Sequence, residues 1–179
     1  MGEQTSEISQ SDFRQPQEIR REWDSNLDAN QLDEMEEWVL QQLKNYYPNL
    51  EENDTADELY KGSMVARELA ANALYRGNLE AGNAADLVAV AKENVEKNKG
   101  LQKRRILALL LLAPHQYELT VTDEGKGFKD EEVPDPLAEE NLLNTHGRGS
   151  LLMRGYGFKR YIEKIPTGFS VRVVKEFEQ

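Results

Sequence analysis

Arg105-Ile-Leu-Ala-Leu-Leu-Leu-Leu-Ala-Pro-His-Gln-Tyr-Glu-Leu-Thr-Val-Thr-Asp-Glu-Gly-Lys-Gly-Phe128 is the stretch on which the fold of this chain depends most. Two apolar runs flank a Pro114-His115 turn, which predicts an antiparallel strand pair. The second run ends at Asp123, and Gly125 and Gly127 follow. Glycines let the backbone approach a ligand closely, and a carboxylate can accept a hydrogen bond from an exocyclic amine. The stretch is therefore compatible with a nucleotide site, although Asp-Gly after a strand is more often a plain turn.

Outside this stretch, the sequence pattern predicts helices in the first half of the chain and strands in the second half. Apolar residues recur at helical spacing after Asn30, and Thr55 with Glu58 forms a capping box that starts another helix. The expected elements are ordered structure from about Ile19–Trp23, helices from Asn30 to before Pro48, from Thr55 to Gly77 and over Ala84–Lys97, and strands over Arg105–Leu112, Tyr117–Thr122, Phe158–Ile165 and Phe169–Phe177.

A long segment, residues 124–150, fits no periodic pattern. Segments of this length inside a compact domain usually serve as lids or binding loops. Because it starts and ends in glycine motifs, we expect it to be a lid.

Length and composition indicate one domain with an N-terminal tail. The 179 residues are 39% hydrophobic, which is enough for one core and short for two domains. Residues 1–17 are polar and without periodicity, so we expect a disordered tail followed by a domain over residues 18–179. The absence of cysteine excludes disulfides, thiolate zinc sites and a cysteine nucleophile. With no apolar run long enough to span a bilayer, we expect a soluble, cytoplasmic protein.

The net charge of −11 is concentrated in the N-terminal third. Residues 1–59 carry a balance of −12, whereas residues 60–179 carry +1. An acidic surface repels phosphates, so nucleic-acid binding is disfavoured.

Glu68 and Asn72 are four residues apart on the second predicted helix, so they project from the same face. Glu68 could accept a proton from a water or hydroxyl, and the Asn72 amide oxygen is a suitable ligand for Mg²⁺. A solvated pair on an exposed face is the competing interpretation.

A third motif is Thr145-His-Gly-Arg-Gly-Ser-Leu-Leu-Met-Arg154, where two glycines precede a short amphipathic segment. Free backbone N–H groups before a helix favour phosphate oxygens, and Arg148 adds a cation. A glycine turn followed by a core helix explains the apolar residues equally well.

Taken in order, the three motifs resemble the ATPase domain of the gyrase, heat-shock chaperone, histidine kinase and mismatch-repair superfamily. The resemblance rests on Glu68-Leu-Ala-Ala-Asn72 with Tyr75-Arg-Gly-Asn78, Asp123-x-Gly-x-Gly-Phe128, Pro134-Asp-Pro136, Glu140-Asn-Leu142 and Gly147-Arg-Gly-x-x-x-Met153-Arg. The chain is most similar to the small anti-sigma-factor serine kinases, over roughly residues 30–177. The resemblance implies an α+β fold of Bergerat type, a two-layer sandwich with a mixed, mainly antiparallel sheet covered on one face by helices.

The resemblance also implies roles for individual residues, with ATP and Mg²⁺ as cofactors. Glu68 would act as general base, Asn72 would hold Mg²⁺, and Asp123 would bind the adenine amino group. The remaining implied set is Gly125, Gly127 and Phe128 around adenine and ribose, Gly147, Arg148 and Gly149 over the phosphates, and a hydroxyl of Thr167 or Ser170 near adenine.

Two functions follow as alternatives. The first is a serine/threonine protein kinase that sequesters a sigma-factor-like target and phosphorylates an antagonist protein, with Arg148 assisting transfer; a homodimer is expected by analogy alone. The second is a nucleotide-gated protein-binding module without phosphoryl transfer. A scaffold that binds no nucleotide is a third interpretation.

Overall fold

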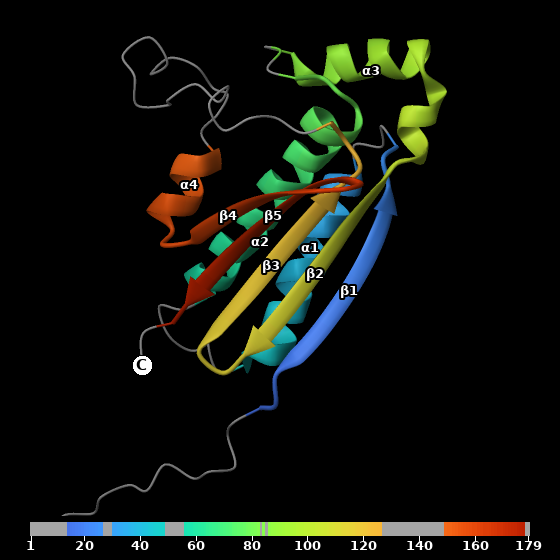
Figure 1. The fold of residues 1–179 in the computed structure, drawn as a ribbon. Coiled ribbons are helices and arrows are strands. Elements are labelled where there is room, and N and C mark those ends of the chain that lie inside the picture. The colour runs from blue at the N-terminus through green and yellow to red at the C-terminus, as the bar shows by residue number, and fades with distance from the viewer. Residues whose placement is uncertain are drawn as a thin grey trace, which may run out of the picture.

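The protein has an α+β fold built on one five-stranded antiparallel sheet (Figure 1). The computed structural model describes residues 14–26, 30–48, 56–82, 84, 86–126 and 149–177. In chain order the elements are β1 (Gln17–Asp24), α1 (Asn30–Tyr46), α2 (Ala56–Ala71), η3 (Asn72–Asn78), α3 (Leu87–Lys97), η4 (Lys99–Lys103), β2 (Arg105–Ala113), β3 (Gln116–Asp123), α4 (Gly149–Gly155), β4 (Lys159–Ile165) and β5 (Gly168–Glu176).

The sheet has the strand order β1-β2-β3-β5-β4. Every pairing among the described strands is antiparallel, so the expected mixed component is not found in this part of the chain. The β2–β3 hairpin turns at Pro114 and His115, which confirms its prediction from the sequence. Because side chains alternate between the two faces of a strand, β2 buries Ile106, Ala108, Leu110 and Leu112 on one face.

Helices α1 and α2 lie against that apolar face, behind the sheet as drawn (Figure 1). Their helical spacing places Met35, Val39 and Leu43 of α1 in the core, together with Val65 and Leu69 of α2. The Tyr47 hydroxyl, just after α1, lies 2.7 Å from the Ala113 carbonyl oxygen and 2.8 Å from that of Gln116. It therefore fixes the helical layer to the hairpin turn.

The predicted helices and strands are found close to their expected boundaries. The first helix ends at Tyr46, before Pro48, and the second continues as η3 to Asn78, one residue past the expected end. The third helix is shorter than expected and begins at Leu87. Its N-terminus is capped by Asp86, whose Oδ1 accepts the Ala89 N–H at 2.9 Å.

The first ordered segment near Ile19–Trp23 is an edge strand, β1, for which the sequence shows no clear signal. Only Trp23 of this strand is buried, whereas most of its other side chains are exposed. Pairing with β2 over Gln17–Asp24 therefore depends on the neighbouring strand more than on an apolar pattern of its own.

Parts of the expected tail and lid lie outside the described residues, namely 1–13 and 127–148. Within the described ranges, no helix combines the length and the apolar character needed to cross a membrane.

Tyr117 and Gly62 test the packing between β3 and α2. The Tyr117 hydroxyl is buried and has no hydrogen-bond partner among the described residues, so Tyr117→Phe should leave the free energy of unfolding unchanged or raise it slightly.

A Cβ at Gly62 would meet the Tyr117 hydroxyl and lie 2.9 Å from Leu43 Cδ1. Overpacking of this kind lowers the free energy of unfolding by about 1–3 kcal/mol. Replacing Gly by Ala in a helix raises it by about 1 kcal/mol, so we expect the overpacking at Gly62 to outweigh the gain.

Gly62→Ala should therefore destabilise the protein in urea unfolding, and less so in the Tyr117→Phe background. A Gly62→Ala protein more stable than wild type would show that this contact is not tight.

Candidate functional site

Glu68 and Asn72 lie together on the last turns of the α2–η3 helix. The Asn72 side-chain N–H₂ donates a hydrogen bond to Glu68 Oε1 at 2.9 Å. Because the nitrogen is engaged, the amide oxygen of Asn72 remains available as an acceptor or a hard metal ligand. Both side chains are partly buried, so they are neither core groups nor fully solvated.

The helix widens into a π-turn directly at Asn72. In a π-helix the backbone hydrogen bonds join residues five apart, as in the 2.8 Å bond from the Leu79 N–H to the Leu74 carbonyl. Gly77 is five residues after Asn72, so it lies one turn further along roughly the same side of the helix. The π-turn therefore extends the Glu68–Asn72 side of the helix to Gly77.

Gly77 provides the surface on which the Asp123 carboxylate rests. A Cβ at Gly77 would lie 2.5 Å from Asp123 Cγ and 2.7 Å from each carboxylate oxygen. A Cβ at Gly125 would in turn meet the Gly77 backbone. These contacts bring the end of β3 against the helix more closely than any side chain would permit.

Asp123 is a buried carboxylate with few partners. Its residue is 7% exposed, and Oδ1 accepts the Gly125 N–H at 2.8 Å. Among the described residues, no group donates a hydrogen bond to Oδ2. Burial raises the pKa of Asp123 from 3.8 to about 6, against the smaller lowering effects of the Gly125 N–H and Arg104. At neutral pH the carboxyl group is mostly ionised and can accept a hydrogen bond from an N–H or O–H group of a ligand.

The start of α4 lies against Glu68. A Cβ at Gly149 would meet Glu68 Oε1 and lie 2.6 Å from its Cδ. The structure thus brings together Glu68, Asn72 and Gly149 in one group, and Asp123 and Gly125 in a second group around Gly77. Gly127, Phe128, Gly147 and Arg148 lie outside the described residues.

Of the two hydroxyls expected near adenine, Ser170 does not face Asp123. It is paired with Thr122, and the two hydroxyl oxygens lie 3.3 Å apart. Because Thr122 and Asp123 are neighbours on one strand, their side chains point to opposite faces. Thr167 lies in the exposed β4–β5 turn.

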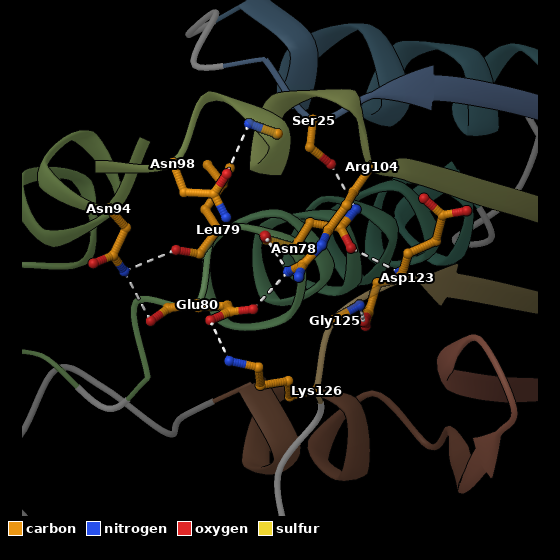
Figure 2. A network of polar contacts seen from close by, with 12 residues as sticks. Ser25, Asn78, Leu79, Glu80, Asn94, Asn98, Arg104, Asp123, Gly125 and Lys126 are labelled. Carbon is orange, nitrogen blue, oxygen red and sulfur yellow. Dashed lines mark hydrogen bonds and ion pairs between the residues drawn. The ribbon is translucent and has the colours of Figure 1, made fainter. Parts of the chain in front are cut away.

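A polar network next to this site, drawn in Figure 2, has no local signature in the sequence and was not predicted from it. Asn78 is its centre, and it is fully buried. Its Nδ2 donates to Ser25 Oγ at 2.5 Å and to the Arg105 carbonyl at 3.0 Å, and its Oδ1 accepts the Glu124 N–H at 2.7 Å. These partners are up to 53 residues away in the sequence, so no local pattern could have identified them.

A second part of the network holds the turn after η3. Glu80, at a positive φ of 55°, forms ion pairs with Arg104 at 2.8 Å and with Lys126 at 2.9 Å. Asn94 of α3 donates to the Leu79 and Glu80 carbonyls at 3.0 Å each. Helix α3 thus supports the turn that follows the α2–η3 helix.

The side chains at this site are of types that could bind a nucleotide together with Mg²⁺. Among the residues that the structure describes, no three His, Cys, Asp or Glu side chains gather so that they could hold a metal ion by themselves. Mg²⁺ commonly takes one or two protein ligands and completes its shell with waters and phosphates. The Asn72 side-chain oxygen could serve as one such protein ligand. The Asp123 carboxylate, which packs against Gly77, could accept a hydrogen bond from a nucleobase.

A scan of the chain against models of protein families gives no match, and a search of curated proteins finds none with significant similarity.

Asp123 should make the stability of the protein depend on pH. The folded-state pKa is above the unfolded value, so the folded protein binds the proton more tightly and loses stability as the pH rises from about 4 to 6. A shift of about two units corresponds to about 2–3 kcal/mol. Asp123→Asn keeps an acceptor for the Gly125 N–H and carries no charge.

Asp123→Asn should therefore be more stable than wild type at pH 7.5, and the difference should vanish near pH 4. Urea unfolding at both pH values measures this. An equal or lower stability of the variant at pH 7.5 would contradict the burial cost assigned to Asp123.

Proposed function

We propose that this chain is an ATP-dependent serine/threonine protein kinase of the anti-sigma-factor type, with a Bergerat-type ATP-binding fold. One observation carries the proposal most strongly. A buried carboxylate, Asp123, rests on Gly77 of the same helix that carries Glu68 and Asn72. The antiparallel sheet with helices on one face is compatible with that fold.

The proposed roles of the residues are those that the family resemblance implies, and the chemistry of each side chain is compatible with its role. Asp123 accepts the hydrogen bond of the adenine amino group, and the Asn72 oxygen binds Mg²⁺. Glu68 accepts the proton of the attacking serine hydroxyl, and its hydrogen bond from Asn72 holds the carboxylate in place. ATP supplies the transferable phosphoryl group, and catalysis depends mainly on positioning and charge neutralisation. Gly149, near the end of the expected lid segment 124–150, lies against Glu68, so the start of α4 covers this end of the site.

The acceptor would be an antagonist protein, and the sequestered partner a sigma-factor-like protein. The alternative is a nucleotide-gated binding module without transfer. The Glu68–Asn72 hydrogen bond favours the kinase, because a binding module does not require an oriented proton acceptor there.

ATP binding is tested by thermal unfolding. ATP with Mg²⁺ at 100 times its dissociation constant should raise the free energy of unfolding by about 2.7 kcal/mol. Asp123→Asn should lose most of this gain, because the Gly125 N–H holds the amide oxygen and leaves the N–H₂ facing the adenine amine. Glu96→Gln, an exposed change on α3, should retain it. A wild-type protein without a shift in millimolar ATP would refute nucleotide binding.

Transfer is tested separately with Glu68→Gln. Gln can still accept the Asn72 hydrogen bond, so the ATP dissociation constant should change little. Loss of a general base should slow phosphorylation of the antagonist by about 10²–10⁴-fold. Labelled ATP and the antagonist encoded nearest to this chain give the measurement, with Glu96→Gln as the charge-matched control. If wild type binds ATP but transfers no phosphate, the binding module is the correct function.

A further inference from the structure

Asn78 connects three segments that meet at the end of β3. Its side chain is bound to the β1–α1 connection through Ser25, to the first residue of β2 through Arg105, and to the residue after Asp123 through Glu124. Its own carbonyl accepts a hydrogen bond from Arg104 Nη1 at 2.8 Å. One buried residue thus fixes the position of the α2–η3 helix relative to the end of β1, the start of β2 and the end of β3 (Figure 2).

The side chain of Asn78 is not itself suited to bind a ligand. Both donor positions of its amide nitrogen are used, its oxygen accepts the Glu124 N–H, and it is fully buried. Any effect of Asn78 on a ligand must therefore act through the groups that it holds.

The group that it holds most directly is the peptide that follows Asp123. On one side, Asp123 is fixed by its pairing with Ile106 in the β2–β3 ladder. On the other side, the Glu124 N–H is bound to Asn78 at 2.7 Å. The backbone is thus fixed on both sides of the Asp123 side chain, and the Gly125 N–H, which donates to Oδ1 at 2.8 Å, orients the carboxylate itself.

Gly77 and Asn78 act on Asp123 from consecutive positions of η3. Gly77 forms the surface beneath the carboxylate, and Asn78 holds the next peptide. A displacement of η3 from β3 would therefore move the surface beneath the carboxylate and release the following peptide together.

We infer that Asn78 is a positioning residue for base recognition, which sets the direction of the Asp123 carboxylate toward the 6-amino group of adenine. The inference rests on the proposed function above. It adds a determinant of selectivity between purine bases that makes no contact with the nucleotide.

The test compares ATP with inosine triphosphate, in which a carbonyl replaces the 6-amino group. Asn78→Ser should weaken ATP binding by about tenfold while changing inosine triphosphate binding little, because only ATP carries the 6-amino group whose hydrogen bond the Asp123 carboxylate is proposed to accept. A purely structural role would weaken both nucleotides equally. Calorimetric titrations are made at a temperature where circular dichroism shows each variant folded.

Two further variants separate positioning from general stability. Asn94→Ala removes neighbouring hydrogen bonds to Leu79 and Glu80 but none to the Asp123 segment, so it should keep the wild-type ratio of the two affinities. In the Asp123→Asn background, Asn78→Ser should produce no further change in that ratio. Equal losses for the two nucleotides, or an additive effect in that background, would overturn the inference.

If Asn78→Ser fails to fold, Ser25→Ala removes a single acceptor of the network. Ser25→Ala should shift the ratio of ATP affinity to inosine triphosphate affinity in the same direction by a smaller factor. A folded Ser25→Ala protein with the wild-type ratio would count against the inference.

If wild type binds neither nucleotide, the proposed function fails, and the carboxyl titration of Asp123 by NMR tests positioning alone. Asn78→Ser or Ser25→Ala should then move that titration toward the value of an exposed carboxyl, and an unchanged titration would overturn positioning.

Discussion

The close approach of the π-helical turn to the end of β3 is the contact on which the site depends. Gly77 and Gly125 meet backbone to backbone, and the Asp123 carboxylate lies in the space that the missing Cβ of Gly77 leaves. Gly168 of β5 approaches the Asp123 carbonyl from the adjacent strand in the same way. Three glycines from three separate elements of the fold therefore pack around Asp123.

The rest of the molecule supplies the rigidity that this approach requires. The apolar faces of α1, α2 and the sheet form one continuous core, which sets the distance between the helical layer and the strands. Tyr47 fixes the helices to one end of the β2–β3 hairpin, and Asn78 fixes them to the other end. Because the helices are held at both ends of the hairpin, the distance between η3 and the end of β3 at Asp123 can vary little.

The cost of this arrangement is the burial of a charge. A carboxylate with no cation hydrogen-bonded to it among the described residues is destabilised by loss of water, which is why the pKa of Asp123 rises to about 6. A ligand with an amino group in this position would replace the lost water. The proposed selectivity for adenine would therefore have the same origin as the structural cost, as is common at binding sites.

Much of the architecture was predictable from the sequence, because apolar periodicity, the Pro114-His115 turn and the helix-start signals act locally. The Glu68–Asn72 pair was predictable for the same reason, since a spacing of four fixes a shared helical face. Only the tertiary structure placed β1 as an edge strand, brought Gly149 to Glu68 and joined Asn78 to Ser25, Arg105 and Glu124. Those relations join residues far apart in the chain, and no local pattern encodes them because the chain must first pack around its core.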